Sequence, residues 1–144
     1  MTERELLIWA LKGDPGAVLF VESLSRISQV WDDLIDGDVE VPHGTINASF
    51  REALTGIPRN PFFLAYRDQL LPVMDVVIND WLAANVLEKG SDDDKQVAWV
   101  IRDSLCALLT FCAQLLGGYE WAEQVSITVR RWTHDESLEE FANG

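Results

Sequence analysis

Residues 18–38, VLFVESLSRISQVWDDLIDGD, decide the fold class of this chain. Apolar side chains recur there at intervals of three and four residues, which places them on one side of an α-helix. The pattern predicts a long amphipathic helix with a buried stripe made of Leu24, Ile27, Trp31, Leu34 and Ile35. Gly37 should end this helix, because glycine readily adopts the left-handed conformation that closes a helix.

Carboxylates gather where this helix ends. Asp32 and Asp36 are four residues apart, so they should share a face beside the buried stripe. Asp33 projects near an expected ion pair between Glu22 and Arg26 on the outer side of the helix. We therefore expect Asp33 to face solvent more than Asp32 or Asp36 does.

Negative charge at this end of a helix opposes the helix dipole and costs a few tenths of a kcal/mol per group. Such a cluster can be a solvated helix end and nothing more, since surface carboxylates are common. Otherwise a positive group offsets it: a cation, a basic partner, or an arginine, for which the chain offers Arg51, Arg67 and Arg102.

The rest of the chain repeats the helical pattern, and no useful length alternates with the period of two that is typical of a strand. Helices are expected at 6–11, 46–54, 60–88, 91–116, 119–132 and 137–140. Helix-start residues support several of them: Asp14–Pro15, Asn60–Pro61 and Ser91. We therefore predict an all-α, single-domain helical bundle of about five to seven helices over residues 1–144.

Two of these helices carry more detailed expectations. Phe50 and Leu54 should pack down from the short helix at 46–54, which Gly56 should close. Pro72 should kink the helix at 60–88, because proline removes one backbone hydrogen bond. The buried stripe of that second helix should contain Phe63, Leu70, Met74, Val77 and Trp81.

Composition limits the possible functions. A chain of 144 residues with 48% hydrophobic residues can form one domain with its own core. The net charge of −13 argues against direct binding to nucleic acid and is compatible with solubility, cation binding or docking to a basic surface. The longest apolar run, near residues 105–116, is too short to span a bilayer. We expect a cytoplasmic protein that contacts neither membrane nor nucleic acid.

The two cysteines predict no disulfide and no zinc site. Cys106 and Cys112 are six residues apart in one expected helix, which separates their Cα atoms by about 9 Å. Neither a CxxC pair nor Cys/His ligand spacing is present. Both should be buried thiols in a reducing compartment.

Residues 31–38, WDDLIDGD, resemble the first aspartate-rich motif of the isoprenyl diphosphate synthases. In that family a DDxxD segment near the end of a helix holds magnesium ions that grip a diphosphate. The resemblance implies that Asp32 and Asp36 are ligands of Mg²⁺, with Asp33 less direct. Hard divalent cations do prefer carboxylate oxygen.

A second resemblance combines three segments: WDDLIDGD, NPFF at 60–63 and LAANVLE at 82–88. Together they look like small uncharacterised proteins of tailed bacteriophages. This resemblance implies a phage-encoded accessory or inhibitor protein in the cytoplasm of a bacterial host.

Two functions follow from the sequence. The first is a non-enzymatic interaction protein that binds a protein partner, or a second copy of itself, through an acidic, aromatic-containing surface. The alternative is a divalent-metal-dependent protein that binds or acts on a phosphate or diphosphate ester, so enzymatic activity stays open. The metal-dependent function would be favoured if five polar side chains line one cavity: Asp32, Asp36, Asn85, Glu88 and Asp103.

Overall fold

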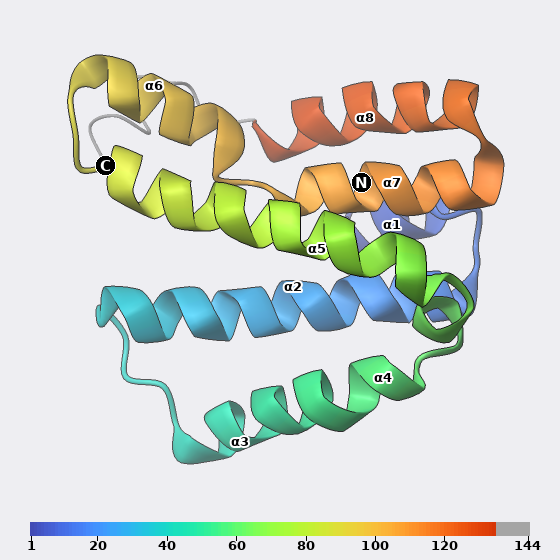
Figure 1. Cartoon of the computed structure of the whole chain (residues 1–144), viewed down its shortest axis with the longest axis horizontal. Coiled ribbons are helices and arrows are strands. Elements are labelled where there is room, and N and C mark those ends of the chain that lie inside the picture. Colours follow the sequence, from blue (N-terminus) through green and yellow to red (C-terminus); the bar gives the residue numbers. More distant parts are fainter. Residues whose placement is uncertain (135–144) are drawn as a thin grey trace. The chain divides into compact units, whose positions relative to one another are not determined.

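The computed structural model describes residues 1–134, and every regular element in this range is helical (Figure 1). The predicted all-α class is therefore confirmed, while the helix expected at 137–140 lies outside the described residues. In chain order the elements are α1 (Glu3–Ala10), α2 (Pro15–Asp36), α3 (His43–Arg51), the π-helix η1 (Glu52–Gly56), α4 (Ile57–Arg59), α5 (Pro61–Leu87), α6 (Asp92–Ile101), α7 (Leu105–Gly117) and α8 (Tyr119–Thr133).

Contacts within the chain group into two compact units that divide between Arg67 and Asp68. The division falls inside α5, next to Tyr66, whose backbone angles (φ −123°, ψ 20°) leave the helical region. The departure from helical backbone angles lies at Tyr66, and a kink at Pro72 stays a prediction. The tyrosine ring packs back one turn, 5.1 Å from the ring of Phe62. The expectation of a single domain stays a prediction.

Aromatic rings form the core of the first unit. Phe20 of α2 is fully buried, and its ring centre lies 5.9 Å from those of Phe62 and Phe63 at the start of α5. Buried Asn60 accepts a hydrogen bond from the Phe63 N–H (3.0 Å), which confirms the predicted cap. Its amide also donates to the Gly16 carbonyl (2.9 Å), so one side chain joins α2 to α5. A Cβ on Gly16 would lie 3.4 Å from the Phe62 nitrogen, so the start of α2 and the start of α5 lie close together at this point.

The helix α2 begins and ends as predicted. Asp14 accepts a hydrogen bond from the Ala17 N–H (2.9 Å), and Pro15 occupies the first helical position. Gly37 closes the helix in the left-handed conformation, with φ +69°. The predicted buried stripe is wrong, because Trp31, Leu34 and Ile35 are exposed and Leu24 and Ile27 are only half-buried. The buried residues of α2 lie in its N-terminal half, at Ala17, Val18, Phe20, Val21 and Ser23.

The helix after α2 also differs from the expectation. It begins at His43 and continues without interruption through α3, η1 and α4, so Gly56 does not end it. In η1 the Ile57 N–H bonds to the Glu52 carbonyl, the wider i to i−5 spacing of a π-helix. Pro58 accounts for this, because a proline ring clashes with the carbonyl four residues earlier and a wider turn gives it room.

The second unit contains a tight α7–α8 hairpin (Figure 1). Gly118, with φ +87°, joins the two helices, which pack along their lengths with Leu108, Leu109, Val125 and Val129 buried. Ser91 and Asp94 cap α6 reciprocally, as a capping box. The single helix predicted at 91–116 is wrong, because residues 102–104 interrupt it between α6 and α7.

The cysteine prediction is confirmed in its structural part. Cys106 and Cys112 are both buried free thiols on α7. Burial raises the pKa of Cys112 to about 12. Burial also raises the pKa of Cys106, although the hydrogen bond that its thiol makes with Thr133 (3.3 Å) acts in the opposite direction. Both thiols are therefore protonated at neutral pH and unsuited to act as nucleophiles.

Candidate functional site

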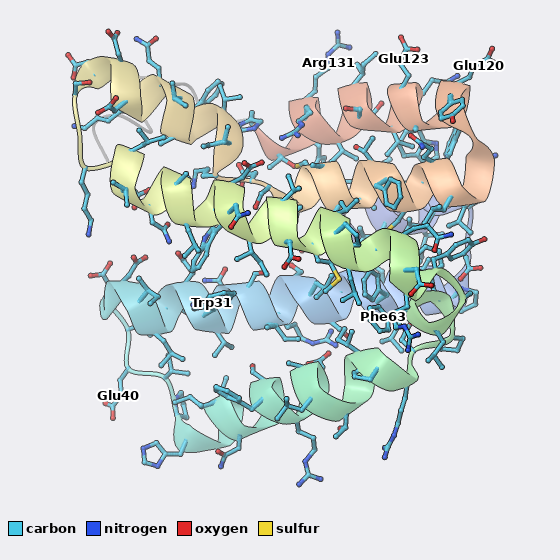
Figure 2. The ribbon with its side chains drawn as sticks, in the orientation of Figure 1. Trp31, Glu40, Phe63, Glu120, Glu123 and Arg131 are labelled. Carbon is cyan, nitrogen blue, oxygen red and sulfur yellow. The ribbon has the colours of Figure 1, made fainter. Side chains whose placement is uncertain are left out.

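The C-terminal end of α2 and the loop after it expose apolar and acidic side chains together. Figure 2 labels Trp31 on this half of α2 and Glu40 in the loop that follows. Ile35 and Val39 are 62% and 60% exposed, and Trp31 and Leu34 are exposed as well. We call this surface the acidic tip, and it consists of Trp31, Leu34, Ile35, Asp36, Asp38, Val39 and Glu40.

The three candidate metal ligands differ in their surroundings. Asp32 and Asp33 are half-buried, whereas Asp36 is exposed. The expectation that Asp33 is the most solvent-facing of the three is therefore wrong. Its carboxylate accepts a hydrogen bond from the Gln29 amide (3.0 Å), one turn earlier on the same helix. This neutral donor partly offsets the charge at the helix end.

No three His, Cys, Asp or Glu side chains among residues 1–134 come together in a way that could hold a metal ion. Asp32 and Asp36 lie one turn apart on α2, and a pair of carboxylates would leave most ligand positions of a divalent cation to water or substrate. Mg²⁺ binding by Asp32, Asp36 and Asp33 stays a prediction.

The expected ion pair between Glu22 and Arg26 is replaced by two pairs that join different helices. Arg4 of α1 bonds to Glu22 at 2.8 Å, and Arg26 bonds to Glu52 of η1. Arg26 also donates to Ser23 (3.3 Å), a buried serine. Burial of Glu52 opposes its ionisation, but hydrogen bonds from Arg26 and Ser23 and the charge of Arg26 together hold its pKa below the usual value.

The other polar residues of the cavity prediction belong to the second unit. Asn85 and Glu88 are half-buried near the end of α5, and Asp103 lies between α6 and α7. Asp32 and Asp36 belong to the first unit. A cavity shared by these residues therefore stays a prediction.

Asp103 takes part in a cluster that sequence reasoning missed. Its carboxylate lies 3.8 Å from His134 Nδ1, and the imidazole ring packs 4.7 Å from the ring of Trp99. The Trp99 indole N–H is buried without a hydrogen-bond partner among the described residues. The cluster fixes the end of α8 beside the α6–α7 junction. This cluster could not be predicted from the sequence, because Asp103 and His134 are 31 residues apart.

A second exposed surface, of opposite charge, runs along α3, η1 and α4. Phe50 and Leu54 were expected to pack inward, but they are 61% and 72% exposed. The expectation was wrong because the inward side of this helix carries Glu52 and Ile57 instead. We call the exposed surface the basic ridge, and it consists of Phe50, Arg51, Leu54, Pro58 and Arg59.

Two stretches are long and apolar enough to cross a membrane by length and composition alone. They are Pro61–Leu87 and Asp92–Gly117, each with a mean hydropathy of 1.4. Core helices of soluble proteins that meet this criterion are mostly buried, whereas the two stretches are 17% and 33% buried. The second stretch is also interrupted between α6 and α7. The absence of membrane contact therefore stays a prediction.

Comparisons of the chain with protein-family models, with curated proteins and with solved structures found no match. The likeness of residues 31–38 to a prenyl synthase motif stays a resemblance, and so does the likeness to phage proteins.

Proposed function

We propose that this chain is a non-enzymatic interaction protein whose acidic tip binds a basic, partly apolar surface of a protein partner. One observation carries the proposal: the last turns of α2 leave large apolar side chains in water beside exposed carboxylates. Between residues 27 and 42 the chain has no Lys, Arg or His, so the tip has one sign of charge. The resemblance to phage proteins would set this binding in the cytoplasm of a bacterial host.

The apolar part of the tip supplies the affinity in this proposal. Full burial of a large aliphatic side chain contributes about 1.5–3 kcal/mol. Four partly exposed side chains therefore offer about 4 kcal/mol, before the loss of translational and rotational freedom on association. The carboxylates add orientation and a faster encounter with a basic surface. Binding should be weak unless the partner covers more of the molecule than the tip.

A basic amphipathic peptide tests the proposal. The probe is a short helical peptide of leucine and lysine, titrated into the full chain and measured by calorimetry. Ile35→Ser combined with Val39→Ser should weaken peptide binding at least tenfold, because these two side chains provide most of the exposed apolar area of the tip. Asp36→Asn with Asp38→Asn should weaken it further at low salt than at high salt.

Control variants outside the tip distinguish binding by the tip from nonspecific binding by any exposed apolar or acidic side chain. Val86→Ser with Val97→Ser removes two exposed apolar side chains from α5 and α6, and Glu120→Gln with Glu123→Gln removes two negative charges from α8. Figure 2 shows both glutamates on α8 pointing away from α7. These controls should bind as the wild type does. Equal binding by the tip variants and the wild type would refute the proposal.

A further inference from the structure

The basic ridge owes its alignment to the π turn. In an uninterrupted α-helix, residues spaced by four drift around the axis, because a turn holds 3.6 residues. The wider turn of η1 takes up this drift. By this geometry Phe50, Leu54 and Pro58 fall on one side of the helix, and all three are exposed. Arg51 and Arg59 flank this line on one side. An apolar line with a basic border is thereby kept facing solvent.

The ridge and the acidic tip have complementary chemistry. Both expose large apolar side chains. The only acidic residue between positions 41 and 60 is Glu52, which is paired with Arg26 on the inner side. The ridge therefore carries positive charge alone, and the tip carries negative charge alone. A protein with a net charge of −13 keeps these two arginines beside an exposed phenylalanine, a pairing that favours an acidic, apolar ligand.

We propose that the tip of one molecule binds the ridge of a second copy of this chain. This inference rests on the proposed function, and it names the partner of the tip. The tip cannot reach the ridge of its own molecule, because α3 and η1 contact α2 through the side opposite the ridge, the side of Glu52. Since the two surfaces differ, the contact is head-to-tail and each copy can bind two others.

The size of the two surfaces sets the strength of the contact. A standard stable interface uses roughly 20–30 residues on each side, several times more than the tip or the ridge provides. The dissociation constant should therefore be on the order of 100 µM, typical of a weak, transient contact. Repulsion between the acidic molecules acts little beyond the Debye length of about 8 Å at physiological salt, so local complementarity decides the contact.

Sedimentation velocity of the full chain, from about 10 µM to 1 mM, tests this inference. The average mass of the wild type should rise with concentration. Arg51→Glu/Arg59→Glu, which reverses the ridge, should stay monomeric, and so should Asp36→Lys/Asp38→Lys, which reverses the tip. An equal mixture of the two variants should associate again, because the intact tip of one meets the intact ridge of the other.

A charge-reversal variant outside the ridge provides the control. Lys89→Glu/Arg131→Glu makes the same change in charge at exposed positions outside the ridge and should associate like the wild type. Circular dichroism confirms that each variant is helical. A wild type that is monomeric throughout, or a ridge variant that still associates, would overturn the inference. If the wild type is monomeric but peptide binding still depends on the tip, the inference fails and the proposed function stands.

Discussion

Glu52 is the residue that joins the π turn to α2, and its charge matters for that role. Its carboxylate bonds to Arg26 and Ser23, and these bonds hold its pKa below the usual value of 4.5 despite partial burial. A carboxyl whose pKa is lower in the folded state contributes stability above its unfolded-state pKa. That contribution is lost as the pH falls through the folded-state pKa.

Glu52→Gln should therefore flatten the pH dependence of stability below about pH 5. We expect the wild type to lose more melting temperature than the variant between pH 6 and pH 3, measured by circular dichroism. Glu40→Gln, in the exposed loop after α2, provides the control and should follow the wild-type curve. An unchanged slope for Glu52→Gln would show that the Arg26–Glu52 pair is energetically neutral.

At this scale the sequence predicted local contacts well and distant ones poorly. Asp14, Asn60 and Ser91 cap helices as expected, because a cap depends on neighbours three residues away. Arg26 could not be paired correctly, because its partner Glu52 is 26 residues away. The spacing of Asp32 and Asp36 predicted that they share one face of a helix. It did not predict that Asp32 is half-buried and Asp36 exposed, because exposure depends on which other helices pack against that face.

At the scale of the element, the backbone requires glycine at one of two positions in the first unit and not at the other. Gly37 closes α2 with φ +69°, a conformation that costs an L-residue with a side chain about 1 kcal/mol. Gly44 lies in the first turn of α3, and a Cβ there would meet nothing within 4 Å. Space is available at both positions, so only the backbone angle distinguishes them.

Gly37→Ala should thus destabilise the protein by about 1 kcal/mol. Gly44→Ala should be neutral or stabilise it by up to about 1 kcal/mol, because alanine favours the helix. Urea denaturation of both variants beside the wild type measures the difference. The same loss of stability in both variants would contradict the assignment of the α2 terminus.

The presence of most helices was predictable, because the apolar residues that indicate a helix are only three or four positions apart in the sequence. The interruption at residues 102–104 and the π turn at 52–56 were not predictable in this way. Asp103 and Ser104 have short polar side chains that compete for backbone hydrogen bonds, but such residues also occur within continuous helices. The sequence predicted that Gly56 ends the helix, whereas the helix continues through Gly56 in a wider turn.

At the scale of the whole molecule, the metal-dependent alternative has a direct test. A site for Mg²⁺ would raise the melting temperature with the logarithm of the Mg²⁺ concentration above the dissociation constant, because the ion would bind the folded state alone. We expect no greater shift with millimolar MgCl₂ than with NaCl at the same ionic strength, and the same response from Asp32→Asn. A Mg²⁺-specific shift that Asp32→Asn abolishes would favour the phosphate or diphosphate function instead.

The division of the chain within α5 limits what sequence could reveal about a site. Periodicity assigned Asp32 and Asp36 to one helix and Asn85 and Glu88 to another, but it carries no information on how distant helices meet. The exposed surfaces were equally hidden, because Phe50 and Ile35 look in the sequence like core residues. An apolar residue reveals an interaction surface only once its exposure is known.

The π turn also has a consequence for variation in length. It holds one residue more than an ordinary turn, so deletion of Thr55 would leave an ordinary α-helical turn in which the Pro58 ring meets the carbonyl four residues earlier. Everything after the deletion would rotate by about 100° relative to α3. Pro58 would then leave the line that begins at Phe50. A single lost codon would thus remove both the alignment of the ridge and the room that the wider turn leaves for Pro58.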